Sequence, residues 1–137
     1  MSNTLHGAIN ASASALTAER ARIEVAVSNL ANAESTRGAD GKPYQRQEVI
    51  LQEKSPSFGE VLGGVMVAGI VNDPTPPRRV YDPGHPDADK DGYVTMPNVN
   101  PVTEMVDLIT SSRGYEANVT AMNAAKQMFT KTFDVLR

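Results

Sequence analysis

Three aspartates at alternate positions form the pattern in this sequence that most resembles a site for chemistry. Residues 87–92 read Asp-Ala-Asp-Lys-Asp-Gly, which fits the first half of an EF-hand calcium loop. The twelfth position of such a loop carries a glutamate that binds calcium through both oxygens, and Asn98 stands there instead. Pro83 and Pro86 also exclude a regular entering helix. We therefore interpret the segment as a surface turn, with calcium binding as the less favoured alternative.

Other groups that could perform catalysis are sparse. The chain has two histidines, His6 near its start and His85 in a loop region, and no cysteine. Neither histidine has a partner histidine or a carboxylate cluster at the spacing that a metal site or a general base needs. The sequence also lacks a nucleophile elbow, a phosphate-binding loop and a dinucleotide fingerprint. We predict a protein that is not an enzyme and that has no cofactor and no metal.

Charge and hydropathy exclude two classes of partner. The net charge is -3 with a pI near 5.3, and no cluster of Lys and Arg provides the electrostatic surface that nucleic acid requires. The longest apolar stretch, Val65–Val71, is far shorter than the roughly 20 residues of a membrane-spanning helix. No apolar signal region precedes Arg20, so we expect a cytoplasmic protein or one exported without a cleaved signal peptide.

Proline and glycine divide the chain into three parts. All nine prolines lie from Pro43 to Pro101, and eight of the ten glycines lie from Gly38 to Gly92. Because proline interrupts helices, the two ends are free to be long helices and the middle is not. We expect a mainly α protein in which 1–36 and 101–137 form one discontinuous helical assembly domain with a coiled-coil-like helix pair. Residues 37–100 then form a small middle domain of short strands and turns.

Both terminal segments carry an apolar residue every seven positions, which is typical of a coiled-coil seam. The first helix is predicted from about Ser2 to Asn32, and its seam positions are Ile9, Leu16, Ile23 and Leu30. The second is predicted from Pro101, with Asn100 as its N-cap, to Leu136. Its main seam comprises Leu108, Tyr115, Met122, Phe129 and Leu136, and its second seam comprises Met105, Ser112, Val119, Lys126 and Phe133.

The middle region contains short segments of β-forming residues. Tyr44–Glu53 and Val65–Val71 are two candidate strands, and Val80–Tyr81 could pair with residues 93–95 as a hairpin across a turn at Asp91-Gly92. The fold of residues 55–80 is left open by the sequence.

The apolar seams favour packing between molecules. One thin partner helix cannot cover all the apolar surface of the C-terminal segment, and exposed patches of that kind mark protein interfaces. A self-contained helical hairpin that packs on the β region is the alternative. Asn29, Asn32 and Asn118 lie near the seams, where we interpret them as setting the register of packed helices, with helix capping or exposure as the alternative.

Two segments resemble signatures of bacterial flagellar rod and hook proteins. Residues 28–36, Ser-Asn-Leu-Ala-Asn-Ala-Glu-Ser-Thr, resemble the signature at the end of the family's N-terminal helix, and residues 113–118, Arg-Gly-Tyr-Glu-Ala-Asn, resemble one in its C-terminal helix. Residues 91–109 look like the approach to that helix in proximal rod members. The chain departs from the family pattern at Leu30, Gly114 and the pair Glu34-Ser35.

The resemblance implies a structural subunit of the proximal rod in the flagellar basal body. Such subunits are exported by the flagellar type III apparatus and polymerise with copies of themselves and other rod proteins, through their terminal helices, into the shaft that transmits torque across the periplasm. We expect the terminal segments to be poorly ordered in the free monomer. A helical adaptor or chaperone-like module of an export system is the alternative function.

Overall fold

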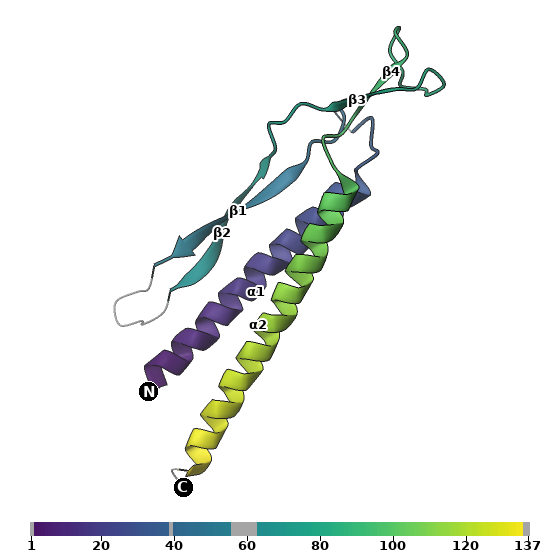
Figure 1. The fold of residues 1–137 in the computed structure, drawn as a ribbon. Helices are drawn as coiled ribbons and strands as arrows, with labels where there is room; N and C mark the ends of the chain where they lie inside the picture. The colour runs from purple at the N-terminus through teal and green to yellow at the C-terminus, as the bar shows by residue number, and fades with distance from the viewer. Residues whose placement is uncertain (1, 39, 56–62, 136–137) are drawn as a thin grey trace.

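The computed structural model describes residues 2–38, 40–55 and 63–135. Helix α1 (Ser2–Ala31) and helix α2 (Pro101–Val135) lie side by side and run in opposite directions (Figure 1). Between them the chain forms strands β1 (Gln47–Lys54), β2 (Gly64–Asn72), β3 (Arg78–Tyr81) and β4 (Tyr93–Met96). The predicted fold class, a paired set of terminal helices with a small β-rich middle, is confirmed.

Helix α2 begins where the sequence predicts. The Asn100 side chain accepts a hydrogen bond from the Val102 amide at 3.0 Å, and the Asn100 carbonyl accepts the first helical bond from the Glu104 amide. Pro101 occupies the first helical position, where its missing N–H removes nothing that the helix uses. Leu136 and the side chain of Phe133 lie outside the described residues.

The helices meet through small side chains. Ala18 and Ala26 of α1 and Ala125 of α2 are each at most 5% exposed. At Gly114, an added Cβ would come within 3.1 Å of the Glu19 side chain, so a glycine here lets the two helices approach closely. In the part of the chain that is described, no helix is both long and apolar enough to cross a bilayer.

Within the chain, the buried line of α2 lies one position before the predicted second seam. Met105 and Lys126 are exposed, whereas the buried line is Glu104, Ser111 and Ala125. One position along an α-helix is a rotation of about 100°. The helix takes this orientation because Glu104 is drawn inwards by polar partners on α1 and on the segment before β1, and because small residues follow at seven-residue intervals.

A second face of α1 is covered by a β-hairpin. Strands β1 and β2 pair antiparallel from Gln47 opposite Asn72 to Lys54 opposite Gly64, with an irregularity between Ile50 and Leu51. Both strands contact α1, and α2 lies on the other side of that helix (Figure 1). This pairing was not predicted, although both segments were identified as candidate strands.

The second hairpin confirms the prediction for residues 80–95. Strands β3 and β4 pair with Tyr81 opposite Tyr93, and their rings meet edge to face with centroids 5.3 Å apart. Gly92 has a φ of 79°, and a Cβ there would come within 2.9 Å of the Tyr81 ring. The turn therefore requires glycine both for its positive φ and for the space that a Cβ would occupy.

Candidate functional site

Asn29 lies at the centre of a buried polar network between the helices and the first hairpin. Its side-chain NH₂ donates to the Gln47 carbonyl at 2.9 Å and to the Glu104 carboxylate at 3.0 Å. Its side-chain oxygen accepts from the Gln47 amide and from the Tyr44 hydroxyl, each at 2.9 Å. The carboxamide thus pairs with both backbone groups of Gln47 as a neighbouring strand would. With 1% exposure and all these bonds made, Asn29 fixes the start of β1 against α1.

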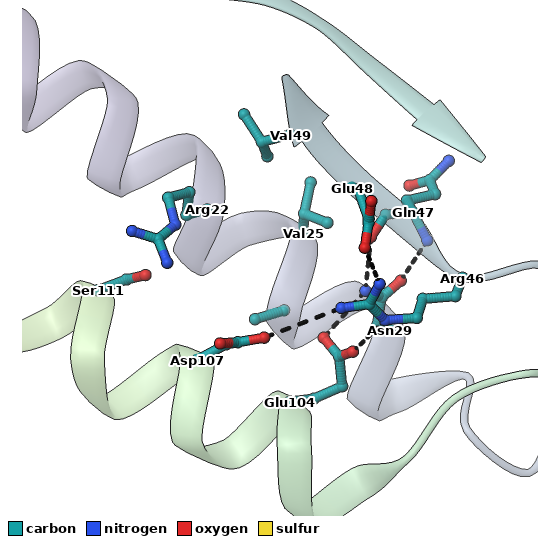
Figure 2. Close-up of a pocket in the computed structure, with 11 residues that line it drawn as sticks. Arg22, Val25, Asn29, Arg46, Gln47, Glu48, Val49, Glu104, Asp107 and Ser111 are labelled. Carbon is teal, nitrogen blue, oxygen red and sulfur yellow. Dashed lines mark hydrogen bonds and ion pairs between the residues drawn. The ribbon is translucent and has the colours of Figure 1, made fainter. Parts of the chain in front are cut away.

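Arg46 and Glu104 form the charged part of the network (Figure 2). The Arg46 Nε donates to Glu104 at 2.6 Å, and its terminal nitrogens contact Glu48, Asp73 at 3.3 Å and Asp107 at 3.9 Å. Glu104 is 2% exposed and Arg46 is 18% exposed. A buried carboxylate needs a paired cation and further hydrogen bonds, and Glu104 has both.

Two charges of the network have shifted pKa values. Partial burial opposes the charged form of Arg46, but hydrogen bonds to Glu104 and Glu48 outweigh it and raise the pKa of Arg46 above its ordinary value. Hydrogen bonds from Thr75, and then from Arg46, lower the pKa of Asp73. Arg46 therefore stays charged at all physiological pH values and acts as a fixed cation. Neither shift prepares a proton donor or acceptor near neutral pH, so the network is suited to holding elements together.

Asn98 connects the second hairpin to the same network. Its side-chain oxygen accepts from the Arg46 amide at 2.8 Å, and its NH₂ donates to the Thr75 carbonyl at 3.0 Å. This residue occupies the position at which a calcium loop would carry its last ligand. Here its side chain forms hydrogen bonds with the backbone of Arg46 and Thr75 instead.

The aspartate-rich segment adopts the turn structure that the sequence favours. Asp89 accepts hydrogen bonds from the amides of Asp91 and Tyr93, both at 2.9 Å. Asp87 accepts from Thr36 at 2.8 Å and pairs with Arg37 at 2.9 Å. Among the described residues, no three His, Asp or Glu side chains are grouped as a metal ion would need.

A small open pocket borders the network between α1, α2 and β1 (Figure 2). Arg22, Val25 and Val49 line it together with residues of the network. Ser111 faces this space from α2; it is 1% exposed, and its hydroxyl has no hydrogen-bond partner among the described residues. The pocket contains no nucleophile with an adjacent base, so it offers no catalytic arrangement.

The three asparagines near the seams have different roles within the chain. Only Asn29 bridges elements. Asn32, one residue past the end of α1, donates to the Ser28 carbonyl of that helix, and Asn118 donates to the Gly114 carbonyl within α2, each at 2.8 Å. The bond of Asn32 matches the capping alternative, whereas Asn118 is half-buried within α2 and matches neither capping nor exposure. A role in setting the register between helices stays a prediction for both residues.

The apolar residues predicted for assembly are divided between the helix pair and the surface. His6 packs edge-on against the ring of Phe129, at 5.9 Å between centroids, and so joins the far ends of the helices. Met105 is 50% exposed and Tyr115 is 38% exposed. The others are half-buried: Ile9, Leu16, Ile23, Leu30, Leu108, Val119, Met122 and Phe129.

An exposed apolar stripe runs along the first turns of α2. Val102, Met105, Val106 and Ile109 are 70%, 50%, 58% and 54% exposed, and their spacing of three and four residues places them on one helix face. We call these four residues the α2 stripe. The sequence analysis identifies only Met105 of these four. The three- and four-residue spacing of the other three indicates a second apolar helix face.

A second exposed apolar surface lies on the first hairpin. Val71 pairs with Glu48, and Met66 pairs with Gln52. Ile50, Met66 and Val71 are 43%, 46% and 45% exposed.

Comparison with known proteins matches both ends of the chain to families of flagellar rod proteins. The family profile described as "Flagella basal body rod protein" matches residues 9–39, and "Flagellar basal body rod FlgEFG protein C-terminal" matches residues 90–135. The "Flagellar basal-body rod protein FlgC" of Bacillus subtilis is 46% identical, over 96% of this chain and 98% of that protein. The proteins of that name from Escherichia coli O157:H7 and Borreliella burgdorferi are 49% and 43% identical, over 87% and 97% of this chain and 88% and 98% of their own lengths.

Proposed function

The chain belongs to the FlgC family of flagellar basal-body rod proteins, and from this membership we propose how it builds the rod. It is a structural subunit of the flagellar basal body and not an enzyme. We propose that it occupies the proximal rod and polymerises there through its terminal helices, with copies of itself and with other rod proteins. The resulting shaft crosses the periplasm and transmits torque from the motor to the hook.

The single observation that carries this proposal is the exposed apolar surface of the helices. The four residues of the α2 stripe are at least half exposed, and no charged side chain interrupts them. A continuous apolar surface of this kind marks a contact with another protein. Its position on a rigid helix, rather than on a loop, suits a contact that must transmit shear.

We propose that residues 1–36 and 101–137 act as one assembly domain, with residues 37–100 on its outside. The interaction residues proposed from the sequence combine the two helix seams with three asparagines. They are Ile9, Leu16, Ile23, Asn29, Leu30, Asn32, Met105, Leu108, Tyr115, Asn118, Val119, Met122, Phe129, Phe133 and Leu136. Support comes from the partial exposure of the seam residues that the structure describes, which leaves part of their side chains for a neighbouring subunit.

We further propose that the subunit passes through the flagellar type III export apparatus without cleavage and is not inserted into the membrane. Mass spectrometry of purified, detergent-extracted basal bodies tests these proposals together. The expected result is this chain, at its uncleaved mass, in stoichiometric amounts with other rod proteins. Its absence from intact bodies that contain a rod would refute the rod assignment and leave a helical adaptor of the export system as the function.

A further inference from the structure

The ion-pair network around Arg46 contains more negative than positive charge. The guanidinium contacts four carboxylates, which belong to Glu48, Asp73, Glu104 and Asp107. Among the described residues, no other Lys or Arg forms an ion pair with these carboxylates, so one positive charge opposes four negative charges and an excess of three remains. The side chains of Glu48 and Asp107 are 49% and 43% exposed, so part of this charge faces solvent. Such a surface attracts cations.

Asp107 is the carboxylate that Arg46 binds least closely. It lies 3.9 Å from the Arg46 Nη2, whereas Glu104 lies 2.6 Å from the Arg46 Nε. A separation of 3.9 Å is too long for a hydrogen bond, so the oxygens of Asp107 retain their capacity to accept N–H donors. Asp107 therefore brings to the pocket between α1, α2 and β1 a charge that the fold neutralises only weakly.

Ser111 provides a second acceptor beside Asp107. The two residues are four positions apart, so they lie one turn apart on the same face of α2, and both line the pocket (Figure 2). Ser111 is 1% exposed, and its hydroxyl forms no hydrogen bond within the part of the chain that is described. A buried hydroxyl without a partner costs free energy, and a donor that enters the pocket removes that cost. This observation is independent of the charge of the network.

The walls of the pocket suit the stem of a long side chain. Val25 and Ala26 of α1 and Val49 of β1 form its apolar part. Its volume is about 170 Å³, several times the roughly 30 Å³ that one water molecule occupies. Arg22 also lines the pocket, but its Nη1 lies 3.3 Å from Glu19, so its charge is already paired. Lysine and arginine combine an apolar stem with a charged end that donates several hydrogen bonds.

We propose that this pocket is a binding site for a basic side chain, a lysine or arginine that a neighbouring subunit inserts between α1, α2 and β1. The charged end donates hydrogen bonds to the Asp107 carboxylate and the Ser111 hydroxyl, and the stem packs on the apolar walls. A metal ion is a poorer occupant, because no three His, Asp or Glu side chains of the described chain are grouped to hold one. That the neighbour is a rod subunit rests on the proposed function, whereas the site itself does not.

NMR spectroscopy of the purified, isotope-labelled subunit tests the site with ethylguanidinium, a cation with N–H donors and a short apolar stem. We expect saturable shifts of the amide signals around Asp107 and Ser111. Tetramethylammonium has the same charge but no N–H donor, so it should give no saturable shift. Asp107→Asn should weaken ethylguanidinium binding about five-fold, because one charge is lost, whereas Asp91→Asn, at an exposed carboxylate of the β3–β4 turn, should leave binding unchanged. Equal shifts with both cations, or none with ethylguanidinium, would overturn the proposal.

Ser111→Ala adds a readout that a purely structural role of the hydroxyl would change in the opposite way. The substitution removes a buried hydroxyl without a partner, so the Tm of the purified subunit should not fall. Binding of ethylguanidinium should nevertheless weaken about five-fold, because one acceptor is lost. A lower Tm would show that the hydroxyl is bonded within the fold, and that result, or unchanged binding, would overturn its role in the site.

Incorporation into basal bodies separates this inference from the proposed function. Asp107→Arg places a cation at the pocket, so it should repel the incoming side chain and lower incorporation, while the circular dichroism spectrum of the purified subunit stays unchanged. Asp91→Arg is the matched control and should be incorporated normally. Normal incorporation of Asp107→Arg would overturn insertion by a neighbour and leave the rod assignment intact. If the wild-type chain is absent from the basal bodies, the rod assignment fails, while the ethylguanidinium titration still decides the site.

Discussion

Replacement of Asn29 by aspartate tests the polar network with almost no change of shape. Asn29→Asp converts the NH₂ that donates to Glu104, at 3.0 Å, into a carboxylate oxygen. Two unit charges at that distance repel by about 5 kcal/mol at an effective dielectric constant of about 20. Proton uptake by the pair limits this cost, because protonating an aspartate of ordinary pKa at pH 7 costs about 4 kcal/mol.

The total loss also includes one hydrogen bond. A protonated carboxyl at position 29 has a single hydrogen, so it cannot donate both to Glu104 and to the Gln47 carbonyl, which adds about 1 kcal/mol. We therefore expect Asn29→Asp to lower the free energy of unfolding by about 4–5 kcal/mol at pH 7. Thermal unfolding followed by circular dichroism should show a Tm lower by on the order of 10–20 °C.

The pH dependence of that deficit gives the sharper test. The new carboxyl has a folded-state pKa raised above its unfolded value, so its penalty is full above the folded pKa and disappears below the unfolded one. Between pH 7 and pH 5, the deficit of Asn29→Asp relative to the wild type should shrink by about 1.4 kcal/mol per pH unit.

Asn118→Asp is the matched control for this variant. Asn118 donates only to the Gly114 carbonyl of its own helix and is half-buried. The same substitution there should cost about 1 kcal/mol and show little dependence on pH between 5 and 7. Equal stability of Asn29→Asp and the wild type at pH 7, or a deficit that does not change with pH, would refute the assignment of Asn29 as the buried donor to Glu104.

Three further predictions follow from other contacts. Arg46→Lys keeps the charge but loses the planar guanidinium that reaches Glu104 and its other acidic partners. In urea denaturation, this variant should have a free energy of unfolding lower by about 2–3 kcal/mol. A loss under about 0.5 kcal/mol would contradict the role of the guanidinium. Calcium titration should leave the Tm unchanged, because the Asp89 carboxylate already accepts hydrogen bonds from the backbone amides of the turn. A rise in Tm would contradict this. Hydrogen exchange in a proven monomer should be slow around residues 25–29 and fast towards residue 5, and strong protection along all of 5–30 would refute the expected disorder of the terminal segment.

Helix existence and helix ends could be predicted because they depend on local signals. The absence of proline from both ends and the cap at Asn100 fix α1 and α2 almost to the residue. The turn at Gly92 likewise depends on one residue that tolerates a positive φ. These features need no knowledge of what lies across the fold.

Helix orientation could not be predicted by the same means. The sequence places Met105 and Lys126 on a seven-residue seam, and apolar periodicity alone favours that face. The structure buries Glu104 instead, because Arg46, 58 residues earlier, and Asn29, 75 residues earlier, provide partners. A long-range ion pair has no periodic signature, and it outweighs the apolar preference of a helix with few large side chains in its interface.

The distribution of polar and apolar groups in this subunit suits a part that must be copied without error. Its helix interface contains Asn29, Glu104 and Ser111, each buried, while valines and an isoleucine of α2 face outwards. A buried ion pair adds little net stability, but it rejects wrong arrangements, because it breaks when the partners shift. A slip of α2 by one residue would move Glu104 by about 1.5 Å and 100°, and would separate it from Asn29. An apolar seam would tolerate such a slip, and the error would be passed to each neighbouring copy. We infer that the chain places its polar groups inside to fix geometry and leaves its apolar groups outside for the assembly, where the binding energy is needed.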